Sequence, residues 1–382
     1  MIKISSPNLD QIAYAYSQKI IPICKERSKY AKIILEVIAG NRPQTALNST
    51  LHGLTRKSLC NFFLENNKMT VIAEIANVTS INAYAWVMTE NVGLIAMLEY
   101  LSIDDNLKEI VLCRPLDTVN LDNNLKTQFG ILPTNEESFF ELIKIVMNYD
   151  LFRNYSYRIA ADIGINTCPY CNRNHIHTVI DENDNDIIRP TFDHFFSQAR
   201  HPLFALSFFN LIPSCYYCNS NLKGNAPMHI DSHIHPYHED FGDHGTFHVL
   251  ISSLRPNKSD PDNYSLSIIN NVSEHSSKHI KIFGDTAGGG NIELFQLKSI
   301  YKSHLDTVGE LIMKCDRLSL KYANSLSGLL ENLGSDKGEF YRFYFSNYLD
   351  EKDLHKRPLS KLSKDIIKQV LPQKIKSIIL DI

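Results

Sequence analysis

Residues 168–224 read CPYCNRNHIHTVIDENDNDIIRPTFDHFFSQARHPLFALSFFNLIPSCYYCNSNLKG, and they contain the most unusual clustering of residue types in the chain. Two Cys-x-x-Cys pairs lie at the ends of this segment: Cys168/Cys171 and Cys215/Cys218. Ten of the fifteen histidines in the chain fall between His175 and His248. Such a concentration of cysteine and histidine is a compositional sign of metal binding.

The two cysteine pairs supply the four thiolates of a tetrahedral structural zinc site. In a reducing compartment this pattern favours metal binding over disulfide formation. Cys-Pro-Tyr-Cys is also the redox motif of glutaredoxins, which requires a preceding strand and a thioredoxin-like sheet. Zinc is the prediction, with a redox dithiol or buried free thiols as the alternatives. The other cysteines are predicted to be small buried hydrophobic residues: Cys24, Cys60, Cys113 and Cys315.

A polar loop divides two short runs of β-branched residues inside the segment. The runs Ile176–Ile180 and Ile187–Phe192 are expected to form a β-hairpin around Asp181–Asp186, and the hairpin ends at Asp193-His194. The acidic loop superficially suggests a calcium site, but it lacks the glycine and the bidentate glutamate of an EF-hand. A turn is therefore the preferred interpretation.

The two residues after this hairpin have side chains suited to hydrolysis. Imidazole has an unperturbed pKa of about 6.5, so His194 can act as a general base near neutral pH. Mg²⁺ prefers oxygen ligands, which the carboxylate of Asp193 and an asparagine carbonyl can supply. Neighbouring residues of a strand point to opposite faces, so one side chain can hold an ion while the other contacts water.

The order of the motifs is more specific than any one of them. Asp193-His194, Asn210-Leu211 and Cys218-Asn219 follow one another as C-x-x-C … D-H … N-L … C-x-x-C-N-x-x-K-G. This pattern resembles the zinc-bearing members of the HNH endonuclease family over residues 168–224. One departure is the lysine, which lies four residues after Asn219 instead of three. Asn221 is therefore an alternative for the final HNH position.

The resemblance implies a ββα-metal core, two kinds of metal ion and a role for each motif residue. His194 is the general base, and Asn210 braces the loop that carries it. Asp193 and Asn219 bind a catalytic Mg²⁺ or Mn²⁺ ion, with Asn221 as the alternate ligand. The four cysteines bind a structural Zn²⁺, because four thiolates leave no open coordination position. Basic residues near the core are candidates for contacts with the phosphate backbone: Lys223, Arg173 and Arg200.

A longer pattern, from Asp193-His194-Phe195 through His201-Pro202 to His235-Pro236-Tyr237, resembles the HNH subunits of bacterial anti-phage defence systems of the Septu type. This resemblance implies a nuclease effector that works with an ABC/SMC-like ATPase partner and cleaves nucleic acid, with DNA favoured over RNA. Two alternatives remain: an RNA-cleaving HNH nuclease, and a non-catalytic zinc module that binds nucleic acid or a partner protein.

The rest of the chain is expected to be mostly helical, which makes the fold class α+β. Helical spacing is clearest over Gln11–Ile38, Glu136–Met147 and Leu151–Ile163, whereas Asn41–Thr50 and Asp117–Asn124 are expected to be polar breaks. Strands are expected at Thr246–Ser253 and Tyr264–Asn270, and a boundary at Gly288–Gly290. The expected domains are a helical domain at 1–160, the zinc-bearing nuclease core at 161–245, and a mixed, then helical region at 246–382.

Charge and hydropathy say little about partners. The formal net charge is −3, so any basic surface for nucleic acid must be local. No secretory signal and no apolar run of about 18 residues is present, which predicts a cytoplasmic protein without a membrane span.

Overall fold

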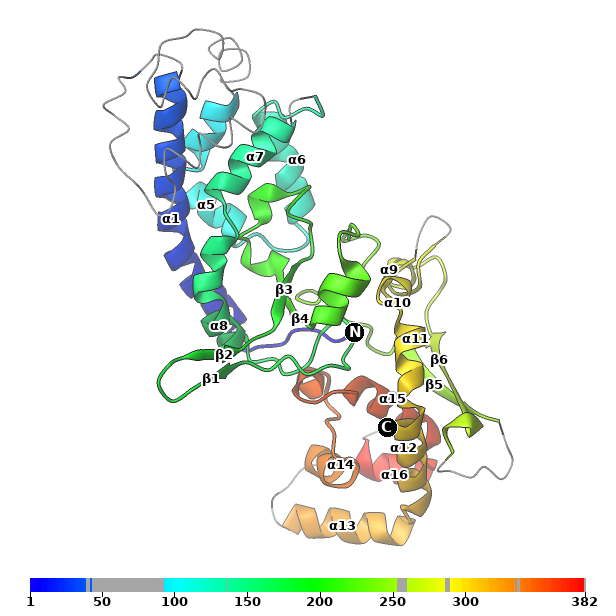
Figure 1. Cartoon of the computed structure of the whole chain (residues 1–382). Helices are drawn as coiled ribbons and strands as arrows, with labels where there is room; N and C mark the ends of the chain where they lie inside the picture. Colours follow the sequence, from blue (N-terminus) through cyan, green and yellow to red (C-terminus); the bar gives the residue numbers. More distant parts are fainter. Residues whose placement is uncertain are drawn as a thin grey trace. The chain divides into compact units, whose positions relative to one another are not determined.

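The computed structural model describes residues 1–38, 42, 93–134, 136–252, 260–285, 289–332, 334 and 337–380. The chain is mostly helical with small two-stranded sheets, and it divides into two compact units (Figure 1). Unit 1 comprises Met1–Pro7, Ala160–Asp193 and Ile212–Ile382, and unit 2 comprises Asn8–Ile159 and His194–Leu211. The α+β class is as expected, and the segment between the cysteine pairs contributes to both units.

Unit 2 is built from helices. Their bounds are α1 Leu9–Ile38, α5 Asp104–Val111, α6 Thr118–Gln128, α7 Glu136–Val146 and α8 Asp150–Ile163, whose last residues belong to unit 1. The three segments with clear helical spacing are confirmed as α1, α7 and α8. Along α1 the buried side chains recur every three or four residues, at Ala13, Tyr16, Ile20 and Cys24. This face packs against α5 and α7 (Figure 1).

The expected polar break at Asp117–Asn124 is wrong, because these residues begin helix α6. Few apolar side chains of α6 are buried, and polar contacts of the buried residue Asp122 help to stabilise the helix. Asp122 is buried, and one of its carboxylate oxygens lies 2.8 Å from Nζ of Lys126 and 2.7 Å from Nδ1 of His201. The other expected break, Asn41–Thr50, lies outside the described residues apart from Arg42.

The hairpin between the cysteine pairs is confirmed, although it is shorter than expected. Strands β1 (Val179–Ile180) and β2 (Asp186–Ile188) pair antiparallel. In the turn between them, Oδ1 of Asp181 accepts hydrogen bonds from the backbone N–H groups of Asn183 (2.8 Å) and Asn185 (2.7 Å). This Asx-type turn supports the choice of a turn over a calcium loop.

The expected single strand Ile187–Phe192 is wrong in its extent. Arg189-Pro190 separates β2 from a new strand, β3 (Thr191–His194), because proline has no N–H to contribute to a ladder. Strand β3 pairs with β4 (Leu211–Ser214), and the π-helix η4 (Tyr217–Lys223) follows directly. Asp193 and His194 therefore end the first strand of a strand–strand–helix unit and not the β1–β2 hairpin.

The C-terminal part of unit 1 combines one hairpin with short helices. Both expected strands are present, as β5 (Gly245–Ile251) and β6 (Tyr264–Asn270), and they pair antiparallel. The helices that follow are α9 Ser277–Phe283, α10 Asn291–Leu294, α11 Leu297–Tyr301, α12 Leu305–Arg317, α13 Leu320–Asn332, α14 Lys337–Phe345, α15 Ser360–Val370 and α16 Gln373–Ile379. The short 3-10 helices of this part are η5 Pro261–Asn263, η6 Lys302–His304 and η7 Glu351–Lys356, whereas η2 Pro202–Phe204 and η3 Phe208–Asn210 belong to unit 2.

Helix α15 completes the edge of β5. Oδ2 of Asp365 accepts a hydrogen bond from the backbone N–H of Phe247 (2.9 Å). Oε1 of Gln369 accepts one from the backbone N–H of Val249 (2.9 Å). These contacts satisfy backbone groups that an edge strand would otherwise expose.

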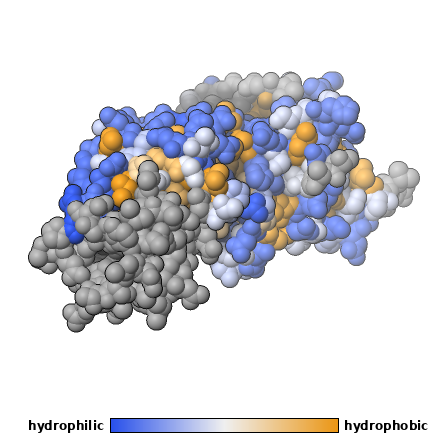
Figure 2. All heavy atoms as spheres, turned by 90° about the horizontal axis from the view of Figure 1, so that it is seen from above, coloured by the Kyte–Doolittle hydropathy of each residue, from blue (hydrophilic) through white to orange (hydrophobic). Residues whose placement is uncertain are grey.

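The face drawn in Figure 2 is largely hydrophilic, with hydrophobic residues scattered among the polar ones.

Candidate metal centre and nuclease site

The two cysteine pairs meet in unit 1. The Sγ atoms of Cys168, Cys171, Cys215 and Cys218 all lie within 4.8 Å of one another, and all four side chains are buried. In the part of the chain that the structure describes, this is the one group of three or more His, Cys, Asp or Glu side chains close enough to share a metal ion. A tetrahedral zinc ion bonds four thiolates at about 2.3 Å, so the cluster is consistent with a structural zinc site.

The four sulfur atoms of the cluster are in an environment that suits a bound cation. Nδ2 of Asn174 donates to Sγ of Cys215 (3.3 Å), and the backbone N–H of Cys218 lies 3.5 Å from the same sulfur. Hydrogen bonds from the other three cysteines lower the pKa of the Cys215 thiol, whereas burial raises that of Cys168. Four buried thiols can ionise together only around a positive charge, which Zn²⁺ supplies.

The structure does not favour the redox alternative. The described sheets each have two strands, so they do not form the thioredoxin-like sheet that a glutaredoxin motif requires. The described single cysteines are buried as expected, and burial raises the pKa of Cys24 and of Cys315 to about 12. Cys60 lies outside the described residues.

Asn172, directly after the first cysteine pair, anchors this pair to the C-terminal helices. It is buried with a φ of 49°, a left-handed conformation that asparagine tolerates better than most residues. Its Oδ1 accepts hydrogen bonds from the N–H of Lys361 (2.9 Å) and the hydroxyl of Ser360 (3.0 Å). These residues begin helix α15, so the turn of the first cysteine pair is held by a contact across almost 190 residues of sequence.

Asp193 lies in a buried polar cluster beside the cysteines. Its Oδ2 accepts a hydrogen bond from the hydroxyl of Tyr170 (2.7 Å), and its Oδ1 accepts one from Nζ of Lys223 (2.8 Å). Tyr170 stands between the cysteines of the first pair and stacks on Phe295, with ring centroids 4.5 Å apart. The turn of the first cysteine pair therefore contacts Asp193 directly through Tyr170. The sequence analysis missed Tyr170, although its place within the Cys-x-x-Cys pair was a usable signal.

His194 begins the unit 2 segment that ends at Leu211. Its Nε2 lies 2.9 Å from the carbonyl oxygen of Ala205, within the same segment. The ring of Tyr149 packs against the imidazole edge-to-face, with centroids 4.7 Å apart. Because a carbonyl oxygen only accepts hydrogen bonds, this contact assigns the proton of the neutral ring to Nε2 and the lone pair to Nδ1.

Asn210 closes the loop that begins at His194. Its Oδ1 accepts a hydrogen bond from the N–H of Phe196 (2.7 Å). Its Nδ2 donates to the carbonyl oxygens of Phe196 and Phe204, both at 3.0 Å. With its side-chain amide engaged on both sides, buried Asn210 holds the two ends of this loop together.

The two candidate asparagines of helix η4 have different environments. Asn219 is half-buried, and its Nδ2 donates to the carbonyl oxygen of Phe192 (3.3 Å), one residue before Asp193. Asn221 is exposed. Asn219 is thus the less exposed of the two, and the role of either residue in binding a metal ion stays a prediction.

The three basic candidates for phosphate contacts are in three different settings. Lys223 is only 4% exposed and pairs with Asp193, so its ammonium is not at the surface. Arg173 is half-buried in unit 1, and Arg200 is exposed in unit 2. Their contacts with nucleic acid stay predictions.

Asp122 and His201 form a second polar pair that the sequence analysis did not find. The pair lies within unit 2, and Nδ1 of His201 is 2.7 Å from the buried carboxylate. No local motif marks it, because its members are 79 residues apart in the sequence.

Comparisons of the chain with protein-family models, curated protein sequences and solved structures found no match. Across the described ranges, no helix has both the length and the apolar character needed to cross a membrane.

Proposed function

We propose that this chain is a metal-dependent nuclease of the HNH type, which hydrolyses phosphodiester bonds in nucleic acid, with DNA favoured over RNA. The observation that carries the proposal is the contact between His194 Nε2 and the carbonyl oxygen of Ala205. It orients the imidazole and places the proton of the neutral ring on Nε2, so the lone pair that a general base needs is on Nδ1.

His194 would act on the water that attacks the phosphorus atom. Nδ1 takes a proton from this water, a bond forms between the water oxygen and phosphorus, and the bond from phosphorus to the 3′ oxygen breaks. Tyr149 and Asn210 support the step indirectly, since one packs on the imidazole and the other holds its loop.

Asp193 and Asn219 have the oxygen atoms that Mg²⁺ or Mn²⁺ prefers. Because the nitrogen of the Asn219 side chain is engaged with Phe192, the carbonyl oxygen is the atom that Asn219 can offer. When bound, the ion would stabilise negative charge on the phosphate and on the departing oxygen. Lys223 already neutralises Asp193, so it would share the carboxylate with the ion or release it.

We also propose that the chain is the nuclease effector of a bacterial anti-phage defence complex with an ABC/SMC-like ATPase. The chain has a formal net charge of −3 and contains no Gly-x-x-x-x-Gly-Lys-Ser/Thr motif. A nuclease without a net positive charge and without this nucleotide-binding motif fits a complex in which a partner captures DNA and hydrolyses ATP. Co-purification of the ATPase with the tagged chain, expressed from its native operon, tests this part.

The nuclease proposal is tested with purified zinc-loaded protein on supercoiled DNA, single-stranded DNA and structured RNA. We expect cleavage in millimolar Mg²⁺ or Mn²⁺, and none with EDTA. Cleavage of RNA alone would identify the RNA-cleaving alternative. Binding without cleavage under every metal condition, alone and with the ATPase, would support a non-catalytic zinc module.

A further inference from the structure

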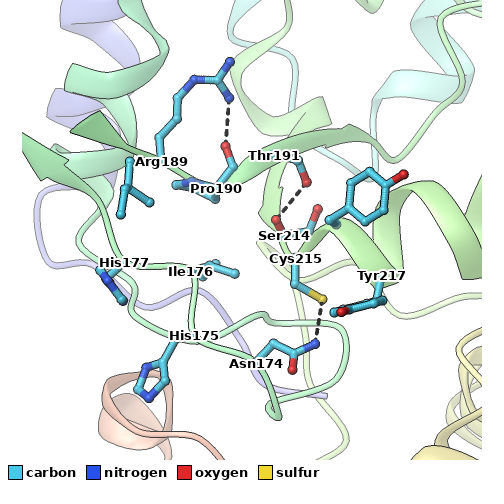
Figure 3. A pocket seen from close by; sticks show the side chains of 12 residues that line it. Asn174, His175, Ile176, His177, Arg189, Pro190, Thr191, Ser214, Cys215 and Tyr217 are labelled. Carbon is cyan, nitrogen blue, oxygen red and sulfur yellow. Dashed lines mark hydrogen bonds between the residues drawn. The ribbon is translucent and has the colours of Figure 1, made fainter. Parts of the chain in front are cut away.

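A pocket of about 380 Å³ lies in unit 1 on the outer side of the second cysteine pair (Figure 3). It is enclosed by the turn after the first cysteine pair, by the link from β2 to β3, and by the start of η4. The floor is closed by a hydrogen bond from the hydroxyl of Thr191 to the carbonyl oxygen of Ser214 (2.9 Å). Its volume is in the range of small-molecule sites, and no acidic side chain lines it.

Four of the side chains that line this pocket are aromatic rings. Tyr216 and Tyr217 stand between the two cysteines of the second pair and are 60% and 56% exposed. Two exposed imidazoles, those of His175 and His177, line it as well, with ring centroids 5.8 Å apart. Large exposed aromatic residues on a backbone held by buried metal ligands are a rigid stacking surface.

Polar groups lie at the edge of the same pocket. Asn174 uses its amide nitrogen on Cys215, so its carbonyl oxygen is the group it can offer to a ligand (Figure 3). The hydroxyl of Ser214 is fully buried and has no hydrogen-bond partner. The guanidinium of Arg189 reaches the rim, where Nη1 donates to the carbonyl oxygen of Pro190 (2.8 Å).

We infer that this pocket binds an unpaired nucleobase of a single-stranded substrate segment. A nucleobase is flat, so it can stack on Tyr216 or Tyr217, and its edge offers donors to the side-chain carbonyl oxygen of Asn174. A base inside a duplex is stacked and paired, so a pocket of this kind selects single-stranded or splayed-out nucleotides. The single cationic side chain at the rim is too little for a site that holds phosphate groups alone.

The inference deepens the proposed nuclease function and rests on it, because it names the form of nucleic acid that the enzyme takes. Zinc-bearing knuckles are among the modules that recognise single strands by stacking. Here the cysteines that hold the zinc site also fix the backbone of the two tyrosines.

Fluorescence anisotropy with full-length His194→Ala protein tests the inference without cleavage. The probes are labelled 20-nucleotide single-stranded DNA, single-stranded RNA of the same sequence, and the matching DNA duplex. We expect Tyr216→Ala or Tyr217→Ala to weaken single-strand binding by about 5- to 150-fold, the effect of losing one stacked base. Tyr217→Phe should bind like the parent, because stacking needs the ring and not the hydroxyl.

Tyr322→Ala is the matched control, since Tyr322 is 48% exposed and remote in sequence from the pocket. Zinc content and melting temperature establish that each variant is folded. Equal single-strand binding by the parent and both alanine variants would overturn the inference, as would equal losses on the duplex. Loss of a co-purifying protein with unchanged oligonucleotide binding would instead assign the surface to a protein partner.

The test separates failure of the pocket from failure of the nuclease. If the parental enzyme cleaves nucleic acid and the tyrosine variants bind it normally, the proposed nuclease function is supported and the proposed base-binding role of the pocket is refuted. Single-strand binding that depends on the tyrosines, without cleavage under any metal condition, keeps the pocket and rejects the nuclease.

Discussion

Nζ of Lys223 lies 2.8 Å from Oδ1 of Asp193, and the two side chains are only 4% and 3% exposed. A buried pair of this kind costs desolvation energy, so its partners depend strongly on one another. The hydroxyl of Tyr170 donates a hydrogen bond to the other carboxylate oxygen of Asp193, Oδ2. Asp193 is thereby fixed in position by the turn of the first cysteine pair on one side and by helix η4 on the other.

Lys223→Met is expected to destabilise the protein by about 3–5 kcal/mol, because it leaves the buried carboxylate of Asp193 without its counter-charge. Urea unfolding measures the change. Lys25→Met is the control, since Lys25 pairs with the largely exposed Asp104 and should contribute at most about 1 kcal/mol. If Asp193 binds a divalent ion, millimolar Mg²⁺ should recover part of the loss. Unchanged unfolding of Lys223→Met would refute the structural role of the pair.

His194→Ala is expected to reduce cleavage by roughly 10²–10⁴-fold, the usual contribution of a general base. Folding and zinc content should not change, because the imidazole is partly exposed and is not one of the four clustered cysteine ligands. Initial rates on supercoiled DNA provide the measurement. The exposed His275 is the control, and His275→Ala should cleave at the parental rate. Parental turnover by the His194 variant would remove it from the mechanism.

One zinc ion per chain is expected from elemental analysis of the purified protein. Cys218→Ser should lose the ion and melt at a lower temperature, because structural zinc binding is coupled to folding. Cys315→Ala, a buried cysteine outside the cluster, should retain the ion. Well-folded parental protein without zinc would contradict the assignment.

Asn219→Ala should raise the Mg²⁺ concentration needed for half-maximal cleavage, whereas Asn221→Ala should have a mild effect. The reason is their position: Asn219 is half-buried and bonded to Phe192, next to Asp193, and Asn221 is exposed. Metal titrations of initial rates compare the two variants. The reverse order of effects would assign the metal to Asn221 and leave the rest of the site intact.

Stability should fall as the pH drops from about 6.5 towards 4. Burial lowers the pKa of His233 from 6.5 to about 4. Between these two pH values the imidazole is protonated in the unfolded chain and neutral in the folded chain, so protons favour unfolding. Burial also lowers the pKa of His304 and of His355, which adds in the same direction.

Urea unfolding at pH 7 and pH 5 tests this dependence, with zinc content measured at both. The His233 contribution is on the order of 1–2 kcal/mol between these values. His233→Gln should therefore lose less stability over this interval than the parent, and His275→Gln should behave like the parent. A steeper loss in the His233 variant would show that the sign is wrong.

Local patterns were enough to predict several parts of the molecule. The spacing of apolar residues predicted α1, α7 and α8, because each helix buries one face whose repeat is visible in the sequence. The two Cys-x-x-Cys pairs predicted the cluster, since buried thiolates in that spacing have few uses other than binding a metal. The polar residues 181–186 predicted a turn, and its hydrogen bonds from Asn183 and Asn185 to Asp181 lie within five residues.

Only the tertiary structure decided which groups share these sites. Asp193 accepts hydrogen bonds from Tyr170 and Lys223, which are 23 and 30 residues away in the sequence. Asn172 accepts one from the backbone N–H of Lys361, which is 189 residues away. Helix α6 was missed because a tertiary partner of Asp122, His201, lies far along the chain. Hydrogen bonds between distant residues leave no periodic signal, because they depend on how whole elements pack and not on the residues nearby. The sequence alone therefore identified the cysteines of the cluster, and packing determined the hydrogen-bond partners of Asp193 and Asn172.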